Sequence, residues 1–241
     1  MFSIFRKKAN VVSDLNWLGV DIHSHMLPGL DDGAKDVNES LLYIKAMEEM
    51  GLDKLFFTPH IFTELYPNSK ETILPALHDV QTIYEGDLKE LGAAAEYMVD
   101  HDFRVDDDLM CLPHNHLLIE MSYLSETPNI EQTVFDLQVK GYKLILAHPE
   151  RYNFYHNNTK RYQRLKEMGC SFQLNLLSIV GYYGKHVSQA AEFLLKENLY
   201  DFAASDLHHN KHLSLLKREV KSGNLYKMIG TYQFKNKSIF G

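Results

Sequence analysis

Two histidines placed two residues apart, His23 and His25, begin the part of this chain that can do chemistry. They follow the apolar segment 17–20, and alternate side chains of an extended strand point to the same side. Two neighbouring neutral imidazoles form half of a metal site, because histidine is the commonest metal ligand. His114 and His116 repeat the spacing but precede a predicted strand, so we expect them to be solvated at the opposite end of the fold.

Further side chains of the kind that bind metals lie in the loop after His25 and within or after later apolar segments. They are Asp31, Asp32, His60, Glu96, Glu120, His148, Asp206 and His208. Mixed imidazole and carboxylate ligands suit zinc, manganese, iron(II) or magnesium. Several carboxylates imply more than one ion, because an acid that bridges two cations is stable where a lone buried carboxylate is costly.

Three acidic residues have simpler explanations that stay open. Asp32 is better explained as a cap of the turn or helix that follows it. Glu120 is either a ligand or the structural partner of Arg151. Glu150 is expected to support its neighbours or to form an ion pair, and not to be a ligand.

The elements that must position these residues alternate along the chain. Strands are predicted at 19–22, 54–58, 93–99, 117–121, 144–147, 170–174 and 202–204, and helices at 37–50, 72–91, 130–140, 159–168 and 188–197. This βαβα order indicates an α/β fold with a parallel sheet, and seven strands suggest a closed or nearly closed TIM-like barrel, whose active site forms at the C-terminal strand ends. An open doubly wound sheet is the alternative, but no G-x-G-x-x-G or Walker A motif follows any strand.

The composition limits the classes of function. The chain has a net charge of −7 and no long basic run, which argues against nucleic acid as the main partner. Only two cysteines, Cys111 and Cys170, are present, which fits reduced thiols and a cytoplasmic protein. No signal peptide or membrane span is expected. We predict an N-terminal arm over residues 1–17, with a basic tip at 6–8, and a single domain over residues 18–241.

Several motifs together resemble a known superfamily. They are D-I-H-S-H-M-L-P-G-L-D-D-G-A at 21–34, T-P-H at 58–60, I-E-M at 119–121, A-H-P-E-R at 147–151 and S-D-L-H at 205–208. They resemble the polymerase-and-histidinol-phosphatase (PHP) superfamily. Within it they are most similar to the bacterial CpsB/YwqE-type protein-tyrosine phosphatases of capsule and exopolysaccharide operons. The resemblance runs from about Asp21 to the C-terminus. It implies a distorted (β/α)7 barrel and three divalent ions, with manganese favoured and iron, zinc or magnesium as alternatives.

The resemblance also implies a set of ligands for each ion. The sets are His23, His25, Glu96 and Asp206 for the first ion; Glu96, Glu120 and His148 for the second; and Asp31, His60 and His208 for the third. The chain departs from the family at 94–97, where Ala-Ala-Glu-Tyr replaces the usual Gly-Gln-Glu-Ile. The usual arginine after the Ser-Asp-x-His motif is also missing, and Lys211 lies nearby.

The expected reaction is hydrolysis of phosphotyrosine on a polysaccharide-export tyrosine kinase, by attack of a metal-bridging hydroxide. Arg151 is expected to clamp two phosphoryl oxygens, and Asp206 and His208 are the candidates for a general acid. A tyrosine phenolate, with a reference pKa of about 10, needs less help to leave than an alkoxide. The cysteine-based phosphatase mechanism needs an arginine six residues after the cysteine, and those positions here are Leu117 and Leu176.

Other functions share part of this pattern. A phosphatase of the histidinol-phosphatase type would use the same ligands. An amidohydrolase-type C–N hydrolase also begins with His-x-His and ends with Asp, but does not need Asp31, Glu96, Glu120 and Arg151 together. A binding protein that keeps the barrel as a scaffold is a non-enzymatic alternative. The expected partner is the phosphotyrosine tail of a bacterial tyrosine kinase, and the resemblance also hints at a homo-oligomer.

Overall fold

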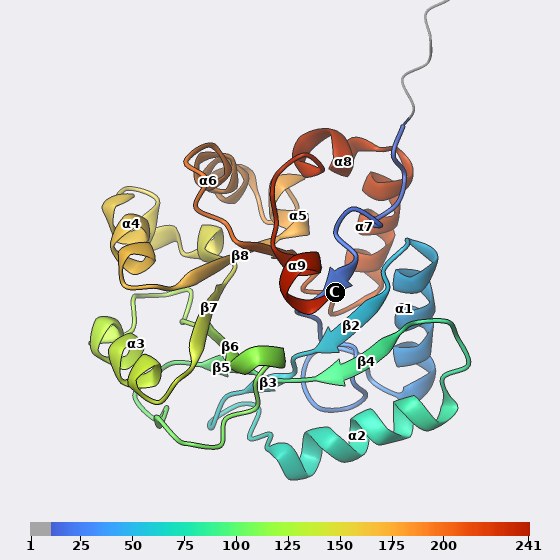
Figure 1. Cartoon of the computed structure of the whole chain (residues 1–241), viewed down its shortest axis with the longest axis horizontal. Coiled ribbons are helices and arrows are strands. Elements are labelled where there is room, and N and C mark those ends of the chain that lie inside the picture. Colours follow the sequence, from blue (N-terminus) through green and yellow to red (C-terminus); the bar gives the residue numbers. More distant parts are fainter. Residues whose placement is uncertain (1–10) are drawn as a thin grey trace, which may run out of the picture.

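Parallel strands form the centre of the fold, and the computed structural model describes them within residues 11–241 (Figure 1). The strands are β1 (Val20–Asp21), β2 (Lys54–Phe57), β3 (His60–Ile61), β4 (Glu90–Ala93), β5 (Glu96–Met98), β6 (His116–Glu120), β7 (Lys143–Ala147), β8 (Ser171–Asn175) and β9 (Phe202–Ala204). They pair in two sheets, in the order β1-β2-β4 and β3-β5-β6-β7-β8-β9. All seven predicted strand segments are present, and two of them lie at a break between strands.

Two breaks between strands connect the two sheets. The predicted strand 54–58 corresponds to β2 and is followed after a break by β3, and the predicted strand 93–99 contains the last residue of β4, a break and β5. Backbone hydrogen bonds continue across both breaks, from the Ala94 N–H to the Phe57 carbonyl (2.8 Å) and from the Glu96 N–H to the Pro59 carbonyl (3.2 Å). At the other edge the Asp206 N–H donates to the His23 carbonyl (2.9 Å), which joins the end of β9 to the end of β1. The strands therefore close into a distorted barrel.

Helices surround the strands (Figure 1). They are α1 (Val37–Glu49), α2 (Lys70–Ile83), α3 (Ile130–Val139), α4 (Lys160–Glu167), α5 (Leu176–Ile179), α6 (Lys185–Lys196), α7 (Asn210–Lys221), α8 (Asn224–Ile229) and α9 (Asn236–Phe240), with short 3-10 turns at Pro113–Asn115, Pro149–Arg151 and Asn153–Tyr155. Local chemistry sets the bounds of α1, because Asp36 accepts a hydrogen bond from the Glu39 N–H (3.0 Å) at its start and Gly51, with φ of 94°, follows its end. The predicted helix 72–91 ends earlier, because β4 occupies its last residues.

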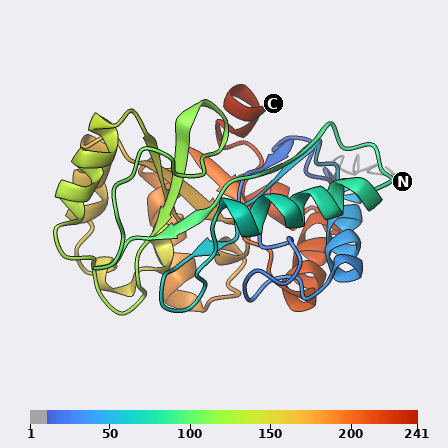
Figure 2. The same ribbon diagram turned by 90° about the horizontal axis from the view of Figure 1, so that it is seen from below.

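The barrel interior is packed and closed at one end by α9. Alternate residues of the strands, such as Val20, Leu118 and Phe202, form an inner cluster with Phe240 of α9. Figure 2 shows α9 at the edge of the molecule, beyond one end of the strands. His116 packs edge-on against Phe202 and Phe240, with ring centroids 6.1 and 5.1 Å away. The expectation of a solvated His116 was therefore wrong, because α9 covers this end of the barrel.

Part of the predicted arm also packs on the fold. Leu15 is buried, and its N–H donates to the Met50 carbonyl at the end of α1 (2.6 Å). Trp17 packs against Tyr226 and Phe234. The predicted arm 1–17 is therefore not separate over its last residues, because these apolar side chains fill space beside α1 and α8. The basic tip at 6–8 lies outside the described residues. Within residues 11–241 no helix is both long and apolar enough to cross a bilayer.

Candidate metal centre

Side chains from six strands, or from the residues that directly follow them, meet at the C-terminal rim of the barrel. The contributing residues are His23 and His25 after β1, His60 in β3, Glu96 in β5, Glu120 at the end of β6, His148 after β7, and Asp206 and His208 after β9. Two of them, His148 (φ 33°) and Asp206 (φ 49°), have a left-handed backbone that is uncommon for residues other than glycine. Strained backbone of this kind is found mainly at functional sites, where the surrounding structure holds it in place.

The first predicted group converges on a small volume. His23 Nε2 lies 3.1 Å from Glu96 Oε2 and 3.3 Å from Asp206 Oδ1. His25 Nε2 lies 3.3 Å and 3.5 Å from the same two oxygens. All four side chains are buried. The four atoms predicted to share one ion therefore lie within reach of a common point.

The second predicted group shares Glu96 with the first. His148 Nε2 lies 3.1 Å from Glu96 Oε1 and 4.0 Å from Glu120 Oε2. His60 Nδ1 lies 3.1 Å from Glu96 Oε2 and 3.0 Å from Glu120 Oε1, so His60 borders this group as well. The two oxygens of Glu96 thus face different histidines, which is the arrangement that a bridging carboxylate needs. Glu120 contacts His60 and has no ion pair with Arg151 among the described residues, so the structural alternative for Glu120 was wrong.

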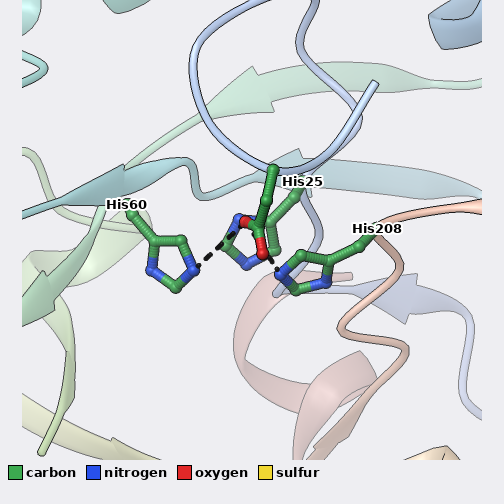
Figure 3. Close-up of side chains that lie close together, drawn as sticks. His25, His60 and His208 are labelled. Atoms are coloured by element: carbon green, nitrogen blue, oxygen red, sulfur yellow. Dashed lines mark ion pairs between the residues drawn. The ribbon is translucent and has the colours of Figure 1, made fainter. Parts of the chain in front are cut away.

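The third group contains Asp32 in place of Asp31. Asp32 Oδ1 lies 3.7 Å from His60 Nε2 and 3.6 Å from His208 Nε2, with His25 beside them (Figure 3). Asp31 instead accepts hydrogen bonds through both oxygens, from His25 Nδ1 (2.7 Å) and the His60 N–H (3.0 Å) on Oδ2 and from the N–H of residue 33 (3.0 Å) on Oδ1. The assignment of Asp31 is corrected: the tight turn after His25 directs Asp31 behind that ring and Asp32 toward the cavity.

Hydrogen bonds on the far side of the rings fix which nitrogen faces the centre. His23 Nδ1 lies 2.9 Å from Gln173 Oε1, and that amide is oriented by donation from its Nε2 to the Leu174 carbonyl (2.7 Å). His208 Nδ1 lies 2.9 Å from the carbonyl oxygen of Asp206. In both rings Nδ1 must be the donor, so Nε2 carries the free lone pair when the ring is neutral. The Asp31 carboxylate has the same effect on His25.

The buried carboxylates of the centre require a positive counter-charge. Burial and the neighbouring His25 lower the pKa of His60, but the Glu96 and Glu120 carboxylates outweigh them and raise it to about 10. Burial would raise the pKa of Asp206, but His23 and His208 hold it well below its usual range. Without another cation, His23, His25 and His60 take up protons to balance the buried carboxylates. A divalent ion would replace those protons.

The residues present fit divalent metal ions. The Nε2 atoms of His23 and His25 are only 3.2 Å apart, although the far side of each ring fixes Nε2 as the lone-pair nitrogen. Glu96 Oε2 and Asp206 Oδ1 are buried and receive no hydrogen bond from the described residues. Buried acceptors without a donor are costly, and lone pairs that converge in this way repel each other unless a cation lies between them. Nitrogen and oxygen donors without thiolate suit the borderline and hard ions predicted from the sequence.

The centre opens into a cavity of about 450 Å³ with aromatic walls. Its lining includes Phe62, Tyr66, Tyr123, Tyr182 and Tyr183, together with the candidate ligands Asp32, His60, Glu120, His148, Asp206 and His208, and with Arg151, His209 and His212. The sequence did not assign Tyr123, His212 or Gln173 to the site. Of these three residues, only Gln173 could have been noticed in the sequence, because it is a polar residue inside an apolar predicted strand. Lys211 lies in a separate shallow hollow with Asn210 and Arg218 and does not replace the missing arginine in this cavity.

Arg151 and Glu150 have different surroundings. Arg151 Nη1 donates to Asp206 Oδ2 (3.0 Å), and the guanidinium borders the cavity. Glu150 is buried and accepts hydrogen bonds from the Asn175 N–H (3.0 Å) and the Tyr200 hydroxyl (2.8 Å), which is the supporting role expected for it. Burial raises the pKa of Cys111 to about 11 and that of Cys170 to about 12, so neither thiol is an activated nucleophile.

Comparisons with known proteins agree with this geometry. A family profile described as "Capsular polysaccharide synthesis, CpsB/CapC" matches residues 19–231. The tyrosine-protein phosphatase YwqE of Bacillus subtilis (strain 168) is 30% identical over 200 residues, which cover 80% of this chain and 78% of YwqE. The putative tyrosine-protein phosphatase CapC of Staphylococcus aureus is 28% identical over 199 residues, which cover 78% of this chain and 76% of CapC.

Solved structures are similar over most of the chain. A crystal structure reported for YwqE from Bacillus subtilis and CpsB from Streptococcus pneumoniae, described as unique metal-dependent tyrosine phosphatases, superimposes with a TM-score of 0.78 at 30% identity and covers 88% of both chains. The lactonase Lmo2620 from Listeria monocytogenes, at 11% identity and a TM-score of 0.53, shares the fold alone. The predicted fold class and the predicted resemblance are both confirmed, and the chain belongs to the CpsB/CapC family of capsular polysaccharide synthesis.

Proposed function

We propose that this protein is a metal-dependent protein-tyrosine phosphatase. The observation that carries the proposal is the convergence of buried imidazole nitrogens and carboxylate oxygens on one cavity that also holds Arg151. The relatives named as tyrosine-protein phosphatases support the same activity. Neither cysteine offers a thiolate nucleophile, so the chemistry must come from the metal centre.

We assign nine residues to three divalent ions, with manganese as the favoured metal. The residues are His23, His25, Asp32, His60, Glu96, Glu120, His148, Asp206 and His208. When bound, the ions supply an activated water at neutral pH and Lewis-acid stabilisation of phosphoryl charge. The chain itself supplies a fixed set of Nε2 lone pairs through Gln173, Asp31 and the Asp206 carbonyl. This fixed orientation avoids reorganisation of the ligands during the reaction.

Arg151 is the residue that we assign to the phosphoryl group. Its Nη1 is anchored on Asp206 Oδ2, which leaves the rest of its planar fork toward the cavity. A guanidinium can donate two parallel hydrogen bonds to a phosphoryl group. Truncation to alanine should therefore lower turnover while the metal content stays the same.

Neither candidate general acid is suited to donate a proton. The pKa of Asp206 lies well below its usual range, chiefly because of His23, and burial and His25 lower the pKa of His208 to about 4. Both groups are therefore unprotonated at neutral pH, and we propose that they act as ligands. A reaction without a general acid favours good leaving groups, and the phenol of tyrosine leaves more easily than the alcohol of serine.

We further propose that the substrate is the phosphotyrosine tail of a polysaccharide-export tyrosine kinase and that the protein acts in the cytoplasm. Membership of a capsular polysaccharide synthesis family supports this choice of substrate. The aromatic wall of the cavity suits a phenyl ring. A homo-oligomer stays a prediction.

The test is a substrate panel after metal stripping and readdition. Phosphotyrosine peptide, phosphoserine peptide, histidinol phosphate and an amide substrate would each be assayed with manganese, zinc and magnesium. We expect activity to return with metal and to be highest on the phosphotyrosine peptide. A preference for histidinol phosphate by orders of magnitude would support the histidinol-phosphatase alternative, and amide hydrolysis would support the amidohydrolase alternative.

A further inference from the structure

Two tyrosines from separate loops enclose the guanidinium of Arg151. The Arg151 Cζ lies 4.5 Å from the ring centroid of Tyr123, in the loop between β6 and α3, and 4.2 Å from that of Tyr183, between α5 and α6. Gly181 and Gly184, with φ of 84° and 96°, border the short turn that carries Tyr183. The cation therefore lies over the faces of two aromatic rings that come from separate loops.

The edge of the guanidinium is only partly used. Among the described residues its side chain makes one hydrogen bond, from Nη1 to Asp206 Oδ2. The same oxygen accepts from Asn175 Nδ2 (2.7 Å), and that amide also donates to the Tyr183 hydroxyl (3.2 Å). Arg151, Asp206, Asn175 and Tyr183 thus form a closed cycle of contacts. A guanidinium has five N–H donors, so most of them remain for a ligand in the cavity.

We propose that Tyr123 and Tyr183 are positioning residues that fix the guanidinium of Arg151 with its free N–H edge toward the phosphoryl group. This inference rests on the role proposed above for Arg151. A flexible arginine would lose side-chain entropy each time it gripped a phosphoryl group. Two aromatic faces impose that loss during folding, and they also exclude water from the cation.

The proposal predicts which atoms of the tyrosines matter. The contact uses the ring faces, so Tyr123→Phe should keep it and Tyr123→Leu should remove it. Tyr183→Phe should keep the ring and lose only the hydrogen bond from Asn175. Each leucine variant should lower kcat roughly tenfold with little change in KM, because a desolvated cation–π contact has about that strength and because Arg151 is expected to act on the transition state.

The first experiment observes Arg151 directly, without metal or substrate. In the 15N-labelled protein the Nε–H signal of Arg151 would be assigned by its loss in Arg151→Ala. We expect a sharp, slowly exchanging signal in the wild type and in both phenylalanine variants, and a broadened or fast-exchanging signal in both leucine variants. Tyr182→Leu is the matched control, because Tyr182 contacts the ring of Tyr183 at its edge and does not cover Arg151. An unchanged signal in the leucine variants would overturn the proposal.

The second experiment is a double-mutant cycle on the phosphatase reaction, with p-nitrophenyl phosphate and a phosphotyrosine peptide. If the rings act through Arg151, the leucine substitutions should change the rate less than twofold in an Arg151→Ala background. An undiminished loss in that background would show that the rings contact the substrate themselves, and would overturn the proposal. If the protein had no phosphatase activity at all, the proposed function would fail, and the NMR measurement would still decide the role of the tyrosines.

Discussion

Asparagine substitutions of the adjacent acids Asp31 and Asp32, made one at a time, test two different roles. We propose that Asp31 orients the ligand His25 and that Asp32 binds metal. Both changes preserve size and remove one negative charge. Asp31 accepts from His25 Nδ1 and the His60 N–H on one oxygen and from the N–H of residue 33 on the other. An asparagine has one acceptor oxygen, so one of these two sides must face an NH2 group that cannot accept. If the NH2 faced His25, the ring would move its proton to Nε2 and lose the lone pair that the centre needs.

The magnitude follows from the hydrogen bond that is lost. A hydrogen bond to a charged group contributes about 1.5–3 kcal/mol, and about 1.4 kcal/mol corresponds to a factor of ten. Asp31→Asn should therefore weaken metal binding roughly 10- to 100-fold, which is the usual effect of removing a residue that orients a ligand. Asp32→Asn leaves the tautomer of His25 unchanged. It should remove part of the site formed with His60 and His208.

The assay is metal-to-protein stoichiometry by elemental analysis as free manganese is raised, with turnover measured on the same samples. Asp31→Asn should recover the full stoichiometry and most of its activity at high metal. Asp32→Asn should stay about one ion short at every concentration. The opposite pattern, with Asp31→Asn short of one ion and Asp32→Asn normal, would refute the reasoning and restore Asp31 as the ligand.

Three further outcomes test the centre and the fold. Chelation of the metal-loaded protein should lower Tm in calorimetry, because a ligand at 100 times its Kd stabilises the native state by about 2.7 kcal/mol; an unchanged Tm after proven metal loss would contradict the proposed site. Burial would raise the pKa of Asp201, but hydrogen bonds from Lys166 and Lys235 lower it below its usual 3.8. The ionised Asp201 therefore stabilises the folded state above about pH 4, and this stabilisation is lost as the pH falls through the folded-state pKa. The Tm difference between wild type and Asp201→Asn should therefore shrink between pH 7 and pH 3, and a constant difference would count against this ion pair. Phe240→Ala should cost about 3–5 kcal/mol in urea unfolding, whereas Phe135→Ala, at a ring 56% exposed on α3, should change stability little; equal effects would argue against α9 as the closure of the barrel.

The order of strands was predictable from the sequence because apolar segments alternate with helical periodicity. The breaks at 58–59 and 94–95 were not predicted, because they lie where the two sheets meet, which depends on the pairing of distant strands. Helix α7 carried a readable signal, since Leu213, Leu216 and Val220 recur at helical spacing and are buried. Helix α9 has five residues, too few for a periodic pattern, and its role depends on a cavity formed by strands far away in the sequence.

The candidate ligands at strand ends were predictable from the alternation of side chains along a strand. A strand fixes the side of each residue, so Glu120, two residues after the interior Leu118, faces the barrel axis. Adjacent acids in a loop have no such periodicity, and the choice between Asp31 and Asp32 depended on the path of the turn. Gln173 stands out in the sequence as a polar residue in an apolar strand, but its contact with the far side of His23 is found only when the strands are placed side by side.

Asp206 connects the metal centre with the arginine that faces the cavity. Its Oδ1 lies toward His23 and His25 and has no hydrogen-bond donor among the described residues, whereas its Oδ2 accepts from Arg151 and Asn175. The two oxygens of one buried carboxylate therefore have separate tasks, and the left-handed backbone of Asp206 sets the direction of both. Protonation of this carboxylate would weaken both contacts at once, which is a physical reason why the centre keeps it ionised instead of using it as an acid. The proposed metal ligands and the proposed phosphoryl clamp thus depend on the same side chain, so they should lose function together when it is changed.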